Sequence, residues 1–203
     1  MASTLKVDNI IATDGTTAPI TLSGDTATLS GTGVTFPAGH IIQLNQTVDQ
    51  SNTTRTGTKT SYASTGVSVT LANELQTNSK LFVYFIAYTG ESAHTGWGNA
   101  HVLTIFQNGT NVCGNQLSDL DADLGLSNAM SGDGATNNQY WVGTHVGSVL
   151  FTPTGTTTAK KSVELYWKQN SGQTNTQTLN SAGNVSTGRS GGATVLTLME
   201  IAQ

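Results

Sequence analysis

The chain has 203 residues and a formal net charge of −4 at pH 7, and only 10% of its residues are charged. Thr (35), Ser (18), Asn (16) and Gly (23) make up 92 residues, so hydroxyl and amide groups rather than ions provide most of the polar surface. These values leave no basic footprint for nucleic acid, and no apolar run approaches the roughly 20 residues that span a bilayer. We therefore expect neither a nucleic-acid partner nor membrane insertion. The abundance of β-branched Thr favours β-structure.

Residues 1–39 are polar and Gly-rich, yet they carry a β-like rhythm. The tetrapeptide Thr-Leu-Ser-Gly occurs twice, at 21–24 and 28–31, and each copy offers one large apolar side chain, Leu22 or Leu29. One leucine per copy is too little to offset backbone ordering of about 1 to 2 kcal/mol per residue in a lone chain. Three parallel copies around one axis would bury more, which favours a trimeric shaft or extended arm. The alternative is a flexible Gly/Thr/Ser linker.

The composition shifts at residues 36–40, Phe-Pro-Ala-Gly-His, where a Pro-Gly hinge ends the polar leader. We place the domain boundary there, with a leader of residues 1–39 and a head of residues 40–203. Segments with strand character follow along the head, at residues 40–46, 59–63, 67–71, 81–88, 102–107, 142–152, 163–168, 177–179 and 194–201. About nine strands with turn-rich spacers predict an all-β sandwich.

The periodicities indicate which strands lie deep. In 81–88 both alternating sets of side chains are apolar, which predicts that one face meets the domain core and the other a neighbouring subunit. In 163–168 one set is apolar and the other mostly polar, so one face lies inside. The last strand, 194–201, is apolar nearly throughout, and we expect it to be central or interfacial.

Cysteine and histidine give little indication of chemistry. Cys113 is the single cysteine, so no internal disulfide forms, and stability must come from packing and subunit association. We interpret it as a small buried residue, because no cysteine motif surrounds it. The histidines, His40, His94, His101 and His145, are too dispersed for a zinc pattern. His40 and His145, expected on strands, are the candidates for an ion on a threefold axis.

Three carboxylates, Asp119, Asp121 and Asp123, alternate in one loop. Their spacing resembles the start of an EF-hand, but Leu124 stands where that loop needs Gly and Met130 where it needs Glu. The loop is therefore not an EF-hand. Two interpretations stay open, a looser Ca²⁺ site or a solvated acidic loop. No other cofactor is expected.

A second candidate site combines aromatic rings with amides and an imidazole, at His94, Trp97, Asn99, Asn137, Tyr140 and Trp141. An aromatic ring packs on the apolar C–H face of a sugar while amides bond its hydroxyls, and this needs no net charge. One interpretation is a glycan-binding surface. The other is that the two tryptophans and the tyrosine pack at loop roots or at a subunit seam.

Three segments resemble parts of the short fibre proteins of marine tailed phages, such as those that infect cyanobacteria. Residues 3–10, Ser-Thr-Leu-Lys-Val-Asp-Asn-Ile, are similar to the leader of such proteins, and residues 36–43, Phe-Pro-Ala-Gly-His-Ile-Ile-Gln, to their shaft-to-head junction. Residues 196–201, Leu-Thr-Leu-Met-Glu-Ile, are similar to their closing strand. The resemblance implies a homotrimer with a jelly-roll-like (TNF-like) sandwich head that touches the host surface.

The resemblance also implies partners and a location. The partners are further copies of the chain, another virion protein contacted through Leu5, Val7 and Ile10, and a host-surface glycan or outer-membrane receptor. The implied location is the virion, as a tail or capsid appendage. Because the first residues lack the regions of a signal peptide, we expect synthesis in the host cytoplasm.

Two other functions are alternatives to a receptor-binding fibre. One is a capsid-decoration or tail structural protein without host contact, and the other is a glycan depolymerase, for which Glu91 with Asp119, Asp121 or Asp123 would supply a carboxylate pair. The chain has no His-Glu-x-x-His, no P-loop and no dinucleotide fingerprint, and we expect no Gly-x-Ser-x-Gly nucleophile elbow. We therefore expect no catalytic residues and no enzymatic activity.

Overall fold

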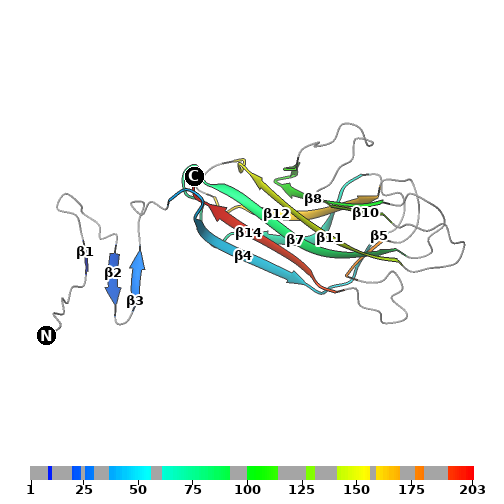
Figure 1. The fold of residues 1–203 in the computed structure, drawn as a ribbon, viewed down its shortest axis with the longest axis horizontal. Helices are drawn as coiled ribbons and strands as arrows, with labels where there is room; N and C mark the ends of the chain where they lie inside the picture. The colour runs from blue at the N-terminus through cyan, green and yellow to red at the C-terminus, as the bar shows by residue number, and fades with distance from the viewer. Residues whose placement is uncertain are drawn as a thin grey trace, which may run out of the picture. The chain divides into compact units, whose positions relative to one another are not determined.

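The computed structural model of the chain describes residues 9–10, 20–23, 26–29, 37–55, 61–91, 100–113, 127–130, 141–155, 159–169, 177–180 and 192–203. Among these residues every element is a β-strand, and the strand pairings are antiparallel (Figure 1). The predicted all-β class is confirmed, and the arrangement is consistent with a β-sandwich. No helix able to cross a membrane occurs in this part of the chain.

The chain divides into two units, Met1–His40 and Ile41–Gln203. The first contains a three-stranded antiparallel sheet in the order β1 (Asn9–Ile10), β2 (Ile20–Ser23) and β3 (Thr26–Leu29). Leu22 lies on β2, and Leu29 lies on β3 opposite Ile20. The two leucines of the repeated tetrapeptide therefore belong to adjacent antiparallel strands of one chain. The trimeric shaft stays a prediction.

The second unit contains the strands β4 (Ile41–Asp49), β5 (Thr53–Arg55), β6 (Ala63–Thr70), β7 (Lys80–Glu91), β8 (Ala100–Gln107), β9 (Thr110–Asn111), β10 (Ser127–Met130), β11 (Trp141–Phe151), β12 (Ser162–Gln169), β13 (Gln177–Leu179) and β14 (Thr194–Ile201). One sheet has the order β10-β8-β12-β6, with β9 beside β8. The other has the order β4-β14-β7-β13-β5, with β11 beside β7.

The long strand β7 organises the second sheet. Along one side it pairs with β11 over its whole length except Lys80. Along the other side residues 80–86 pair with β14, and residues 89–91 pair with β13. Through most of the sheet the strands therefore run β4, β14, β7, β11 in lateral order (Figure 1).

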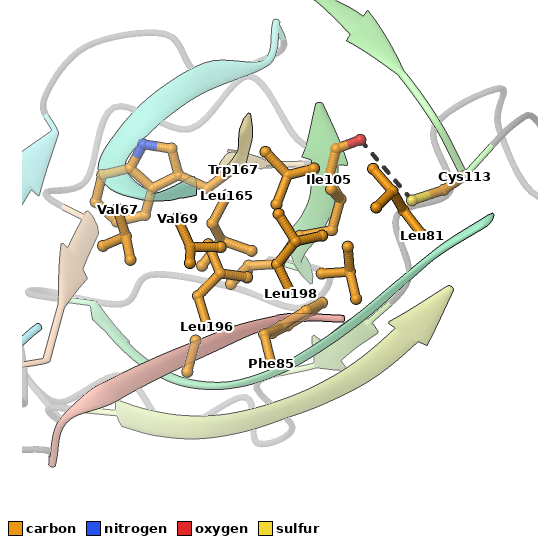
Figure 2. Packing of buried hydrophobic residues seen from close by; sticks show 14 of the residues in the cluster. Val67, Val69, Leu81, Phe85, Ile105, Cys113, Leu165, Trp167, Leu196 and Leu198 are labelled. Carbon is orange, nitrogen blue, oxygen red and sulfur yellow. Dashed lines mark hydrogen bonds between the residues drawn. The ribbon is translucent and has the colours of Figure 1, made fainter. Parts of the chain in front are cut away.

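The core lies between the two sheets, and each sheet contributes alternate residues to it (Figure 2). Its large members are Val67 and Val69 on β6, Leu81, Val83 and Phe85 on β7, Leu103 and Ile105 on β8, Val163, Leu165 and Trp167 on β12, and Leu196 and Leu198 on β14. Each contributes about 1.5 to 3 kcal/mol on burial. Because successive side chains of a strand point to opposite faces, the intervening residues of β7 and β14 face away from this core.

Most predicted strands agree with the observed ones. The segments 177–179 and 194–201 coincide with β13 and β14. The segments 81–88, 102–107, 142–152 and 163–168 correspond to β7, β8, β11 and β12, and 40–46 corresponds to β4, which runs on to Asp49. The inward face predicted for 163–168 is confirmed, since Val163, Leu165 and Trp167 are buried.

The prediction for β6 was wrong at both ends. The strand spans Ala63–Thr70 rather than 67–71, and of the predicted 59–63 the residues up to 60 lie outside the described part. Thr65 points inward although it is polar, because its hydroxyl donates to the Leu165 carbonyl at 2.7 Å. Gly66 has φ +83°, and the register with β12 shifts at this point. A buried hydroxyl and a bulge glycine thus mask the apolar alternation.

Candidate functional site

One face of the six-stranded sheet carries all the exposed large apolar residues in the described part of the chain. They are Ile41 (53% exposed), Leu44 (51%) and Val48 (55%) on β4, and Val146 (52%) and Leu150 (51%) on β11. We call this surface the outer face: the side of β4, β14, β7 and β11 that points away from the core. Half-buried Phe82 and Ile86 lie on β7 between them, as do Val195 and Met199 on β14.

Strand register orders the outer face in three rows, because directly opposed residues of antiparallel strands lie on the same side of a sheet. The first apolar row is Leu44, Met199, Phe82 and Leu150. The polar row is Gln46, Thr197, Tyr84 and Ser148. The second apolar row is Val48, Val195, Ile86 and Val146. A band of hydroxyls and an amide therefore crosses all four strands between two apolar bands.

The polar row is partly bonded within the chain. The Gln46 Nε2 donates to the Thr197 Oγ1 at 3.0 Å, which joins β4 to β14. Within the described residues the side chains of Tyr84 and Ser148 form no hydrogen bond, and both remain accessible. The hydroxyls of Tyr84 and Ser148 can therefore form hydrogen bonds with a partner molecule.

The three rows contain no charged residue. Lys80 lies one row beyond the first apolar row, opposite Ile201. Four strands at about 4.8 Å and the five residues of β7 from Phe82 to Ile86, about 17 Å, give the three rows an area on the order of 300 Å² before side-chain relief is counted. The largest apolar patch of a single chain is of this order and is often a functional surface.

The edges of this sheet lie beside the other sheet. The Thr47 hydroxyl on β4 donates to the Ser68 carbonyl on β6 at 2.8 Å. On the opposite side β10 lies next to β11. Association through this sheet is therefore expected to use its face rather than its edges.

A second feature is a cavity of about 380 Å³ at the end of the sheet where β4 and β13 end and β14 begins. Gln50, Asn52, Asn180, Gly192 and Ala193 line it. The buried Asn180 has φ 60°, and its Nδ2 lies 3.0 Å from each of three acceptors, the carbonyl and Oδ2 of Asp49 and the Ser51 carbonyl. Its Oδ1 accepts from the Thr194 hydroxyl at 2.7 Å. Asn180 therefore ties three strand ends together, and its amide is occupied by the protein itself.

The structure describes few of the residues predicted as sites. Trp141 begins β11, where it pairs with Glu91 of β7, and Ile10 ends β1 opposite Ile20. The other predicted ligand, metal and attachment residues lie outside the described residues: His94, Trp97, Asn99, Asn137, Tyr140, Asp119, Asp121, Asp123, Leu5 and Val7. Within the described ranges no three His, Cys, Asp or Glu side chains come together as a metal site. The Ca²⁺ loop and the glycan surface stay predictions.

Of the two histidines considered for an ion on an axis, His145 lies on a strand, β11, as expected, and His40 does not. His145 is fully buried, on the same side of the sheet as its partner Ala87, and its Nε2 lies 2.7 Å from the Thr89 Oγ1. Along β11, Gly143, His145 and Gly147 are buried while Thr144, Val146 and Ser148 are exposed, so His145 points into the core of its own chain. It therefore cannot meet the same residue of other copies on a symmetry axis. His40 is exposed and lies just before β4 rather than on a strand.

The interpretation of Cys113 as a buried residue is confirmed. The side chain is 5% exposed, and its Sγ lies 4.0 Å from the Ile105 carbonyl (Figure 2). Burial raises the pKa of the thiol and outweighs contacts with Thr104 and Ile105 that lower it. A reactive cysteine needs a lowered pKa, so this environment does not activate Cys113 as a nucleophile.

Residues 188–192, Gly-Arg-Ser-Gly-Gly, have the spacing of a Gly-x-Ser-x-Gly elbow. That motif positions its serine on a turn from a strand into a helix. Here strand β14 begins at Thr194, two residues after Gly192. The residues that follow the pentapeptide therefore do not provide the helix that a nucleophile elbow requires.

No protein-family model matches the chain, and no curated protein matches it either. Function must therefore be inferred from the chain's own residues and geometry. Sequence reasoning missed the exposed apolar residues of β4 and β11, although Leu44, Gln46 and Val48 alternate with smaller polar residues as a two-faced strand should.

Proposed function

We propose that this chain is a homotrimeric fibre protein of a tailed-phage virion, whose head attaches the virion to the host-cell surface. The observation that carries the proposal is the outer face with its exposed Ile41, Leu44, Val48, Val146 and Leu150. A head that leaves such a surface uncovered needs a partner to cover it. A fibre head obtains that partner from its own copies.

The free energy of covering the face is large enough to drive association. Each of the five exposed side chains keeps about half of its surface in water. Full burial of such a side chain contributes about 1.5 to 3 kcal/mol. Burying the exposed half of all five side chains would therefore stabilise the assembly by about 5 kcal/mol, before the half-buried residues are counted. The three rows, roughly 300 Å² in area, would form the centre of a standard interface of ~800 Å² per partner.

The chemistry of the face favours a second copy over a different partner. In a closed symmetric assembly each copy presents the same patch, so unpaired charges on that patch would meet like charges. The rows between Leu44 and Val146 carry none. A charged partner would find no complementary group there, whereas an identical neutral face is compatible with itself.

The strand order supports a jelly-roll description of the head. The strands β4, β14, β7 and β11 are neighbours in one sheet, and β6, β12, β8 and β10 in the other. Along the chain β4, β6, β7 and β8 alternate between the two sheets. Eight strands wound between two sheets in this way are the pattern of a double Greek key.

The virion and host parts of the proposal rest on the sequence resemblance of residues 3–10, 36–43 and 196–201 to phage fibre proteins. In this account the leader holds the head to another virion protein through Leu5, Val7 and Ile10. The head contacts a glycan or an outer-membrane receptor. Three heads on each fibre and several fibres on each virion multiply weak single contacts.

Immunolabelling tests the function directly. An antibody raised against this chain should label purified virions of the phage that encodes it at the tail, and should reduce adsorption of those virions to host cells. An antibody against a major capsid protein is the control for virion integrity. Label on capsid faces with unchanged adsorption would contradict host attachment and support decoration instead, and virions without label would contradict the virion assignment.

A further inference from the structure

We propose that the polar row sets the axial register in which copies of this chain associate. Gln46 and Thr197 of one copy lie level with Tyr84 and Ser148 of the next. The inference rests on the proposed function, in which the copies are related by a threefold axis, and it places that axis parallel to the strands of the outer face. Beyond self-association, it names the residues that meet across the interface and the group that prevents one copy from sliding along another.

The row has the composition that such a role needs. It runs across all four strands at one level, because Thr197 pairs with both Gln46 and Tyr84, and Tyr84 pairs with Ser148. Its groups are an amide and three hydroxyls, which both donate and accept hydrogen bonds without charge. The Gln46–Thr197 bond holds one end of the row in place. Tyr84 and Ser148, at the other end, have no side-chain partner among the described residues.

The apolar rows on either side make other registers unfavourable. A slide of one row, two residues or about 7 Å along the strands, would place the hydroxyls of Tyr84 and Ser148 against Leu44 or Val48 of the neighbouring copy. Those hydroxyls would then lose water without gaining a partner, which is costly in a dry interface. A polar group at a single level of an apolar interface fixes the register of coiled coils in the same way.

The symmetry decides which strands meet. Rotation about an axis parallel to the strands closes the copies into a ring only when like rows face like rows, because a slide at each interface would turn the ring into an open screw. By making that slide unfavourable, the polar row favours the closed ring. The same rotation brings the β4 side of one outer face next to the β11 side of the next. Gln46 of one copy therefore lies near Ser148 of another, although within one chain they are three strand spacings apart, about 14 Å.

Paired cysteines test this arrangement in the full chain. Leu44→Cys with Leu150→Cys leaves the polar row intact and places thiols in the first apolar row, on opposite edges of the face. Leu44→Cys with Val146→Cys is the matched control, since Val146 is an equally exposed apolar residue of β11 but lies two rows away. Neither pair can close within one chain, because a disulfide requires Cα atoms within about 7 Å. The native Cys113 is buried and serves as a common background.

Mild oxidation followed by a non-reducing gel gives the result, with light scattering of the unoxidised variants alongside. We expect the same-row pair to become a covalent multimer and the control pair to run as a single chain, a difference of at least tenfold in cross-linked yield. Oligomers in which the control pair cross-links as well as the same-row pair, or in which neither does, would overturn the register while leaving self-association intact. Unoxidised variants and wild type that scatter as monomers would overturn the proposed homotrimer itself.

Discussion

The Gln46 amide donates to the Thr197 hydroxyl at 3.0 Å, and this bond lies in the polar row, between the two apolar rows of the outer face. Thr197 is 4% exposed, whereas Gln46 is exposed. The residues are 151 positions apart in the chain, and they meet because β4 and β14 pair in antiparallel register. A neutral polar level with apolar levels above and below it is the central feature of the outer face.

Val48→Asp should convert the assembled protein to single chains. Val48 is 55% exposed in one chain, so an aspartate is tolerated by the fold, but a carboxylate buried in a self-interface costs several kcal/mol. Light scattering measures the mass, and circular dichroism checks the fold. Thr70→Asp, at an exposed position of β6 on the other sheet, is the control and should keep the wild-type mass. Retention of the oligomer by Val48→Asp would contradict the role of the outer face.

Gly192→Ala should destabilise the head more than Gly66→Ala does. Both glycines have positive φ, +126° and +83°, so both alanines are strained. At Gly66 a Cβ meets nothing within 4 Å, whereas at Gly192 it would lie 2.7 Å from the Tyr88 Cε2. We expect losses of about 1 to 2 kcal/mol at Gly66 and about 2 to 4 kcal/mol at Gly192, measured by denaturant unfolding. Equal losses would show that the Tyr88 ring moves aside without cost.

Two buried glutamines should respond differently to substitution. Both amide atoms of Gln177 are buried without a hydrogen bond, so Gln177→Met removes an unsatisfied group and should raise the free energy of unfolding by about 1 to 3 kcal/mol. The Oε1 of Gln107 accepts from the Thr154 N–H at 3.0 Å, but its Nε2 is buried without a hydrogen bond. In Gln107→Met the lost bond and the removed unsatisfied donor offset each other, so the free energy of unfolding should change by less than about 1 kcal/mol. Thermal or denaturant unfolding of the two variants measures both changes. A loss of stability in Gln177→Met would mean that its amide has a partner in the folded protein.

Cys113 should make the head less stable at alkaline pH. Burial raises the pKa of the folded thiol, while the unfolded thiol ionises near pH 8.5. Below about pH 8.5 the thiol is protonated in both states, and its full contribution to the free energy of unfolding is present. As pH rises toward the higher pKa of the folded state, the unfolded thiol ionises first, and this contribution is lost. The difference in unfolding free energy between wild type and Cys113→Ala should therefore shrink between pH 7 and pH 10. A difference that stays constant over this range would show that the two states ionise alike.

The sequence predicted the deep strands well and the surface poorly, for physical reasons. Alternation in 163–168 identified core residues such as Trp167, because burial of large apolar side chains leaves a period of two in the sequence. In 81–88 both sets are apolar, so the sequence did not show that Phe85 rather than Phe82 faces the core. The start of β6 was missed because Thr65 satisfies its hydroxyl in the core. Local alternation alone could not predict it.

The rows of the outer face could not be predicted from any single strand. A strand reveals which of its residues share a side, but the level at which it meets its neighbours depends on register between distant segments. Tyr84 and Ser148 become neighbours only when β7 and β11 pair. The candidate loops around Trp97 and Asp121 lie outside the described residues, so their roles stay predictions.

The measurement that tests the central claim most directly is the solution mass of the full chain by light scattering at several concentrations. Self-association through the outer face predicts a mass of three times 21.1 kDa that persists on dilution. A mass of 21.1 kDa at all concentrations would contradict the account, because Leu44, Val48, Val146 and Leu150 would then stay in water in the native state.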